Sequence, residues 1–328
     1  MNGNVSNCSS SNVVFAVFQQ RYLPPMFGVE FLLAVTWNSL AIWLFFTREK
    51  NWHSGIIYSF NLAMADLLYA LSLPLLITYY AWVKNWTYGK GLCKLERFVF
   101  NSNLYGSIFF ITCISLNRYI GIVHPFFAHS NIEPKHAKII SVIVWMLVFV
   151  INLPVLVFST IQPTLVNNAT LTECIGSAVD VRLKDYIPYS LFMAVFACGL
   201  PFIITFSCYV AIVWTVYKNE NITLAEKKKI GAMIFIVVSL YAISYVPYVV
   251  LRNINLYRRT QCNDTAVKDT SVFIHSSYQV TKGLVTLNMC IHPLLYAAVT
   301  DSMRTLCAKC VGKKPVRHSV IDSVNHPL

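Results

Sequence analysis

Charged residues are scarce in this 328-residue chain, since Asp, Glu, Lys and Arg together make up 12% of it. A soluble globular protein carries about 25% charged residues, which cover the surface that it presents to water. The shortage therefore argues against an ordinary soluble domain. The 56% of hydrophobic residues predicts a membrane protein instead.

Three other features are missing from the sequence. The first dozen residues lack the basic start and the short apolar core of a cleavable signal peptide, so we expect the first spanning helix to act as its own signal. No stretch between the apolar runs is long enough for a soluble domain of useful size. We find no internal repeat, which argues against the transporters that are built from repeated halves.

Acidic residues are outnumbered, because 14 Asp and Glu face 26 Lys and Arg and leave a net charge of +12. Such an excess can indicate a nucleic-acid partner. In a membrane protein, however, basic residues first mark the cytoplasmic flanks of the spans. We therefore expect membrane lipid, and no nucleic acid, around this chain.

Seven apolar runs approach or exceed the roughly 20 residues that a spanning helix needs. They cover about 26–47, 56–81, 93–124, 138–160, 186–217, 228–254 and 273–299. The sequence thus predicts an all-α membrane protein with a seven-transmembrane helix bundle over residues 26–299. Residues 1–25 are expected to form an extracellular N-terminal segment. Residues 300–328 are expected to form a cytoplasmic tail that opens with a short amphipathic helix.

The orientation follows from basic residues and glycosylation sequons. Lysines and arginines dominate the segments that lie inside if the N-terminus is extracellular. Five Asn-x-Ser/Thr sequons fall outside in the same orientation, at Asn4, Asn7, Asn85, Asn168 and Asn263. The outer half nevertheless carries many bases that topology does not require, which indicates an anionic partner.

Four of the ten cysteines fall on the extracellular side of the membrane, where disulfides form. Four cysteines allow three pairings. Cys93 opens the third span and Cys174 lies in the long outer loop, so a bond between them would hold that loop over the bundle. A bond between Cys8 and Cys262 would tie the N-terminus to the last outer loop. We predict these two bonds.

Cys307 and Cys310 follow the last span on a short basic segment. Two interpretations stay open for them, S-palmitoylation and unmodified thiols beside the membrane.

Several short motifs occur in a familiar order. "LNRY" contains Asn117, Arg118 and Tyr119, "NLAMADL" contains Asp66, and "SYVPY" precedes a final "HPLLY". With the seven spans and the two outer cysteines, these motifs resemble the rhodopsin-like G-protein-coupled receptors over the whole chain. In that family the motifs read Asp-Arg-Tyr and Asn-Pro-x-x-Tyr, so this chain departs from them at Asn117 and at His292.

The resemblance implies a G-protein switch made of Asn117, Arg118, Tyr119 and Tyr296. The arginine is held in the resting state and contacts the G protein when the sixth helix swings out. Asn117 replaces the acid that usually helps to hold it. Lys227 stands where many relatives carry another acid, so we expect weaker restraint by polar groups such as Tyr296.

Longer stretches, "CKLERFVFNSNLYGSIFFITCIS" and "YQVTKGLVTLNMCIHPLLY", resemble the metabotropic purinergic nucleotide receptors. They are most similar to the ATP-preferring member that couples to Gq and Gs. The resemblance implies a multi-pass plasma-membrane receptor for extracellular nucleotides, with ATP favoured. It also implies signalling through Gq, and through Gs, to phospholipase C, calcium and adenylate cyclase. Arrestin and receptor kinases would be further partners.

Helical spacing places three polar stripes near the outer ends of three spans, since residues three or four apart share a face. The stripes are Arg97, Asn101 and Tyr105 in the third span, Tyr245, Tyr248 and Arg252 in the sixth, and Tyr278, Lys282 and Thr286 in the seventh. Three cations on three helices predict a polyanion site, because the arginine fork matches phosphate. Aromatic rings beside them suit a flat base. The alternative is three interface charges that snorkel to water.

The resemblance supports the ligand interpretation. Arg97, Arg252 and Lys282 fall on the cation positions that bind nucleotide phosphates in purinergic receptors. Tyr278 and Gln279 match positions near the ligand. Arg182 and Lys184 in the long outer loop are additional candidate contacts, and Val249 stands where the family often has histidine.

A second polar group lies in the middle of the spans, and buried polar groups need partners. Its members are Asn38, Asp66, Asn103, Ser107, Asn288 and His292. Asp66, Asn103, Ser107 and Asn288 match family positions around a bound sodium ion, so the resemblance implies sodium as a modulator and no other cofactor. A hydrogen-bonded water cluster is the alternative. His292 competes with both, because a protonated imidazole would neutralise Asp66.

Other classes of function fit the sequence less well. A transporter or channel needs a polar path across the bilayer, whereas these polar positions stop in mid-membrane. An intramembrane enzyme needs a catalytic constellation, for which Asp66 and His292 are the only candidates, so we expect no enzyme. The alternative that stays open is a receptor of the same fold for a carboxylate metabolite or a lysolipid.

Overall fold

The computed structural model describes residues 12–166, 169–220, 222–260 and 268–299. Its helices in chain order are α1 (Asn12–Thr47), α2 (Ser54–Ala70), α3 (Leu73–Ala81), α4 (Gly89–Val123), α5 (Pro125–Asn131), α6 (Pro134–Phe158), α7 (Leu183–Phe192), α8 (Leu200–Lys218), α9 (Leu224–Ser239), α10 (Val246–Thr260) and α11 (Lys268–Val299). Two strands, β1 (Thr160–Val166) and β2 (Ala169–Ile175), lie between α6 and α7.

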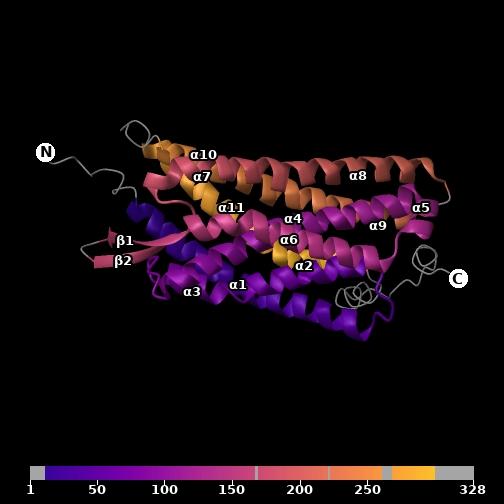
Figure 1. Ribbon diagram of the computed structural model, residues 1–328, viewed down its shortest axis with the longest axis horizontal. Coiled ribbons are helices and arrows are strands. Elements are labelled where there is room, and N and C mark those ends of the chain that lie inside the picture. The colour runs from indigo at the N-terminus through magenta and orange to yellow at the C-terminus, as the bar shows by residue number, and fades with distance from the viewer. Residues whose placement is uncertain (1–11, 167–168, 221, 261–267, 300–328) are drawn as a thin grey trace.

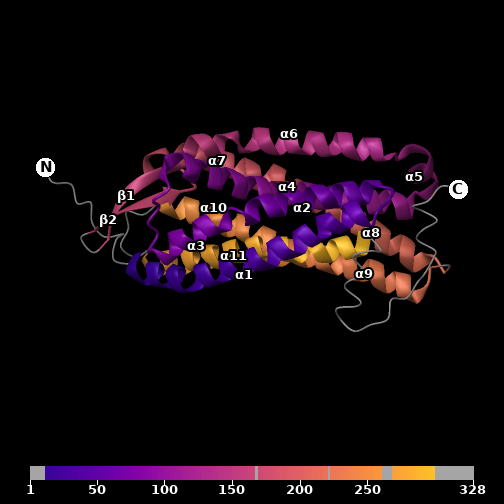
Figure 2. The same ribbon diagram turned by 90° about the horizontal axis from the view of Figure 1, so that it is seen from below.

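The predicted bundle of spanning helices is confirmed. Within the described ranges, six continuous helical stretches are long and apolar enough to cross a membrane: Gln20–Thr47, Ser54–Ala81, Gly89–Val123, Pro134–Phe158, Leu183–Lys218 and Glu226–Thr260. The 32-residue α11 supplies the seventh. The helices run side by side along the long axis of the molecule in both views (Figures 1 and 2).

The first helix begins earlier than the apolar run suggests. α1 starts at Asn12 and contains Pro24 and Pro25, so it reaches into the segment 1–25. The side chain of Gln20 donates to the carbonyl of Ala81 at the end of α3, at 3.1 Å. A contact of this kind, between positions 61 residues apart, cannot be read from hydropathy.

Prolines reshape the fifth and sixth spans. A π-helical segment, Met193–Gly199, separates α7 from α8, and Pro201 follows at the start of α8. A second one, Leu240–Tyr245, separates α9 from α10 just before Pro247. Proline cannot donate a backbone hydrogen bond and its ring collides with the preceding turn. A widened turn relieves that collision and keeps each span continuous.

The β1–β2 hairpin is an addition to the expected all-α architecture. The strands pair antiparallel with Thr160 opposite Ile175, and they lie at the end of the bundle that also holds α3 and the last residues of α10 (Figures 1 and 2). In the sequence, two threonine-rich segments with alternating polar and apolar residues flank two asparagines, which is a hairpin pattern. The prediction of spanning helices did not consider it. This end is the extracellular one.

The predicted bond between Cys93 and Cys174 is confirmed, and it ties the start of α4 to β2 with a Cα–Cα distance of 5.7 Å. The first outer loop is tied to the same strand. The backbone N–H of Trp86 donates to the carbonyl of Thr172 at 2.7 Å, and the N–H of Thr172 donates to Asn85 Oδ1 at 3.1 Å. The hairpin is therefore held over the outer ends of the helices by one covalent bond and several polar contacts.

Candidate ligand site and polar network

The three predicted cations lie inside the bundle. Arg97 on α4, Arg252 on α10 and Lys282 on α11 are 7%, 7% and 5% exposed. Side chains that snorkel along a lipid-facing surface would keep their charged ends in water. Burial in the protein interior instead requires compensating partners, and the structure supplies different ones for each cation.

Arg252 is surrounded by oxygen acceptors. Its guanidinium donates to Asn101 Oδ1 at 3.3 Å, to the Tyr105 hydroxyl at 3.4 Å, and to the Tyr186 hydroxyl in a short contact. The guanidinium carbon also lies 5.9 Å from the centre of the Tyr186 ring. The structure thus joins the predicted stripes of α4 and α10. It adds Tyr186 on α7, which no sequence pattern linked to them.

Lys282 lies among aromatic rings. Its Nζ is 3.4 Å from the Tyr80 hydroxyl, 5.6 Å from the centre of the Tyr80 ring and 5.4 Å from that of Phe100. Such cation–π contacts are worth more where water is excluded. Next to them, the rings of Tyr248 and Tyr278 stack at 5.7 Å with an interplanar angle of 27°. Tyr80 and Phe100 were not predicted as site residues.

Arg97 differs from the other two cations because it has a carboxylate partner in the part of the chain that the structure describes. Its Nη1 is 3.3 Å from Glu96 Oε2, and its Nη2 donates to the carbonyl of Cys174 at 3.1 Å. Gly176 lies so close that a Cβ there would be 2.6 Å from Arg97 Cδ. Arg97 therefore lies directly under the loop that the disulfide holds.

The other two predicted ligand contacts lie at the edges of this group. Gln279 is 7% exposed, and its amide nitrogen is 3.3 Å from His275 Nε2. Arg182 lies over the ring of Phe158 at 5.0 Å, and that ring packs edge-on against Tyr186. Arg182 is thus connected to the Arg252 group through aromatic packing.

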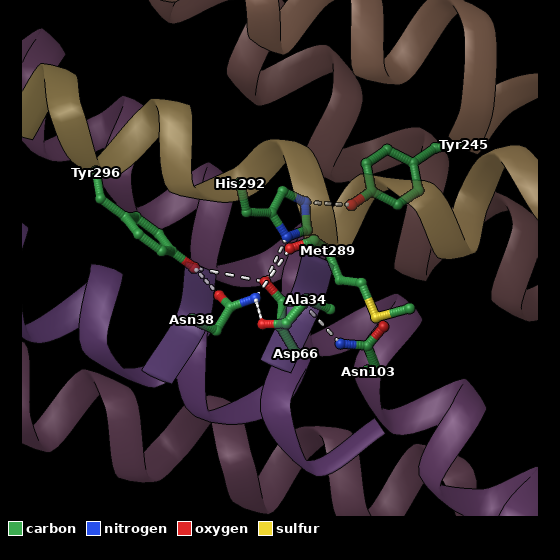
Figure 3. Close-up of polar contacts among 8 residues, drawn as sticks. All are labelled: Ala34, Asn38, Asp66, Asn103, Tyr245, Met289, His292 and Tyr296. Atoms are coloured by element: carbon green, nitrogen blue, oxygen red, sulfur yellow. Dashed lines mark hydrogen bonds and ion pairs between the residues drawn. The ribbon is translucent and has the colours of Figure 1, made fainter. Parts of the chain in front are cut away.

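Four of the six predicted mid-membrane polar residues form one network around Asp66, which Figure 3 shows: Asn38, Asp66, Asn103 and His292. Asp66 Oδ1 accepts from Asn103 Nδ2 at 2.9 Å, and Oδ2 accepts from His292 Nδ1 at 2.7 Å. The hydroxyl of Tyr296 donates at 3.4 Å to both Asp66 Oδ2 and Asn38 Oδ1. His292 Nε2 in turn lies 3.1 Å from the hydroxyl of Tyr245. The network therefore connects α1, α2, α4, α11 and the π-helical segment of the sixth span.

The contacts of Asp66 bear on the predicted sodium ion, which stays a prediction. Each oxygen of Asp66 accepts from a nitrogen donor, at 2.9 and 2.7 Å, and a carboxylate oxygen has a lone pair left for a second contact. Ser107 is 1% exposed, and its Oγ has no hydrogen-bond partner among the described residues. The side chain of Asn288 has none among them either, and such orphaned groups suit a buried water molecule or an ion.

The predicted switch residues divide between two places. Tyr119 at the inner end of α4 contacts His124 Nε2 through its hydroxyl at 3.1 Å, and Arg118 interacts electrostatically with Tyr209 on α8. Asn117 is half-buried beside them. Tyr296, by contrast, is fully buried in the Asp66 network.

Several predicted positions lie outside the described residues: Asn4, Asn7, Cys8, Asn168, Cys262, Asn263, Cys307, Cys310 and the helix expected after the seventh span. Among the sequons, Asn85 is described. It is half-buried, and its side chain accepts the hydrogen bond from Thr172.

Comparisons with known proteins agree with this architecture. Residues 37–296 match the family model described as the seven-transmembrane receptor of the rhodopsin family. The purinoceptor 11 of Homo sapiens is 41% identical over 315 residues, which cover 90% of this chain and 83% of the relative. The purinoceptor 1 of Gallus gallus is 37% identical over 301 residues, which cover 92% of this chain and 82% of the relative.

The chain belongs to the rhodopsin family of seven-transmembrane, G-protein-coupled receptors and, within it, to the purinoceptors. It is a multi-pass protein of the plasma membrane, and its family is one of receptors.

Proposed function

We propose that this protein is a receptor for extracellular nucleotides, with ATP favoured, and that it signals through heterotrimeric G proteins, Gq first and Gs in addition. One observation carries the proposal. Arg97, Arg252 and Lys282 converge from three helices in a largely buried region under the disulfide-held loop. A polyphosphate supplies several negative charges there and would offset the unfavourable burial of like charges.

The remaining parts of a nucleotide have suitable neighbours. The stacked rings of Tyr248 and Tyr278 offer a flat surface for a base. Arg252 already donates to three oxygens, and a guanidinium can exchange such neutral acceptors for charged phosphate oxygens with a gain in strength. A carboxylate metabolite or a lysolipid would use the cations but would leave the tyrosine pair without a flat partner.

The route to the G protein runs through two helices that the site and the network share. Arg252 and Tyr245 belong to the sixth span, and Lys282 and His292 belong to α11. An agonist that draws Arg252 and Lys282 toward α4 would shift Tyr245 against His292, which bonds Asp66. We propose that this displacement frees the sixth helix to swing out beside Arg118. Arrestin and receptor kinases then act on the active form.

The test is a set of concentration–response curves in cells that express the full chain, with calcium and cyclic AMP as readouts and ATP, ADP, UTP and a dicarboxylate as ligands. We predict that Arg252→Ala and Lys282→Ala each raise the required agonist concentration by about tenfold or more, because a charge-assisted contact is worth roughly 1.5–3 kcal/mol. Lys90→Ala removes an exposed outer cation and is the matched control. Unchanged potency of both site variants at normal surface expression, or activation by the dicarboxylate alone, would overturn the proposal.

A further inference from the structure

A buried carboxylate lies beside Arg97, one of the three cations. The side chain of Glu96 is 0% exposed, and its Oε2 is 3.3 Å from Arg97 Nη1. Neither oxygen of Glu96 has a hydrogen-bond partner within the described residues. Glu96 is therefore fully removed from water and is satisfied by the charge of Arg97 and, without direct contact, that of Lys282, whereas buried charges normally require hydrogen bonds as well.

Arg97 is held on two sides. The carbonyl of Cys174 accepts from its Nη2 at 3.1 Å, and Glu96 faces its Nη1. The Nε of Arg97 has no partner in the described part of the chain. A guanidinium binds phosphate best with two parallel N–H donors, so an anion that engages Arg97 has to compete with Glu96 for the same group.

The other two cations differ in this respect. Arg252 contacts hydroxyl and amide oxygens, and Lys282 contacts a hydroxyl and two rings. These direct contacts are neutral, so an incoming anion displaces no charged group from either cation. Among the groups that contact the three cations, Glu96 adds a negative charge next to the place where phosphate charge would gather.

We propose that Glu96 is a specificity-determining residue that competes with the ligand for Arg97 and penalises ligands in proportion to their negative charge. The proposal rests on the proposed function, since it concerns the nucleotide site itself. The physical reason is that Coulomb repulsion between Glu96 and the ligand grows linearly with ligand charge. Glu96 therefore reduces the difference in potency between a triphosphate and a diphosphate or monophosphate.

The test replaces Glu96 with glutamine, which keeps the size of the side chain and removes its charge. Full-length receptor is titrated with adenosine tri-, di- and monophosphate, and calcium release gives the potency of each. We expect potency for the triphosphate to rise by about fivefold or more, the difference between a charged and a neutral partner, with a smaller gain for the diphosphate and the smallest for the monophosphate. The ratio of two potencies within one variant compares the ligands at one level of expression.

Two variants make the result specific. Glu173→Gln removes another acid from the outer end, but this acid pairs with Lys84 at 3.4 Å and is 35% exposed, so the potency ratio should change by less than about twofold. In an Arg97→Ala background the gain from Glu96→Gln should become smaller, because no guanidinium is left to release and only the direct repulsion between Glu96 and the ligand remains. If Glu96→Gln does not reach the cell surface, Glu96→Asp takes its place. The shorter side chain increases the distance to Arg97, so the ratio of nucleotide potencies should shift in the same direction but by less.

The outcomes separate the two proposals. Equal gains for the three nucleotides, no gain, or the same gain from Glu173→Gln would overturn the role of Glu96. If potency still depends on Arg252 and Lys282 in that case, the nucleotide site stands and only the inference fails. If potency is independent of those two cations, the proposed function itself fails.

Discussion

Replacement of His292 by asparagine tests whether the imidazole takes the place of a sodium ion at Asp66. His292 Nδ1 lies 2.7 Å from Asp66 Oδ2, and the two side chains are 1% and 0% exposed. Asparagine is shorter than histidine, so Asp66 Oδ2 should lose its partner and become available to a cation. Asn103 keeps its bond to Asp66 Oδ1. We therefore expect a cation site to appear in the variant at a position that the native side chain fills.

The expected magnitude follows from allosteric coupling, which is typically about 1–3 kcal/mol, or roughly 5–150-fold in affinity. Agonist affinity of the native protein should change by less than about twofold when sodium chloride replaces choline chloride at constant ionic strength, whereas that of His292→Asn should fall by about fivefold or more. Displacement of a radioligand by agonist measures both. The loss of one partner from a buried pair destabilises a protein by about 3–5 kcal/mol, so sodium should also raise the melting temperature of the variant.

Tyr245→Phe is the matched control for this experiment. It removes the hydroxyl that lies 3.1 Å from His292 Nε2 and leaves the imidazole against Asp66. Its agonist affinity should therefore stay as insensitive to sodium as that of the native protein. An equal response to sodium in native protein and His292→Asn would refute the reasoning and would leave His292 with a packing role only.

Three further predictions concern the loops and the inner switch. Mass spectrometry of unreduced peptides should find Cys8 bonded to Cys262, and a bond from either residue to a third cysteine would contradict this. Asn117→Asp should lower ligand-free G-protein signalling by about five- to thirtyfold, since a restored contact of about 1–2 kcal/mol holds the resting state; equal basal signalling would show that the missing acid is immaterial. Asn85→Ala should destabilise the detergent-purified receptor by about 1–2 kcal/mol because Thr172 loses its acceptor. Thr87→Ala abolishes the same sequon but keeps that bond, so an equal loss in both variants would point to the glycan instead.

The spans and their orientation could be predicted because each depends on local properties. The bond between Cys93 and Cys174 joins positions 81 residues apart, and it could be predicted only once the orientation had placed both cysteines on the outer side. Hydropathy over about 20 residues reports the preference of one segment for lipid, and flanking bases report its orientation. The three cations could be predicted as well, since helical spacing places Arg97 above Asn101 and Arg252 above Tyr248 without knowledge of any neighbour. A single buried charge in an apolar run is a local signal of function.

The partners of those charges were decided by tertiary structure alone. Tyr186 contacts Arg252 across 66 positions, Tyr80 contacts Lys282 across 202, and Asp66 contacts His292 across 226. Hydropathy gives no register between such distant segments. Glu96 is adjacent to Arg97 in sequence, yet its burial depends on the loop and the helices that cover it. The sequence by itself determined which groups enter the membrane, because transfer into lipid is a property of each segment. Only packing decided which charges meet there, because a buried ion selects its partner by distance and by the exclusion of water.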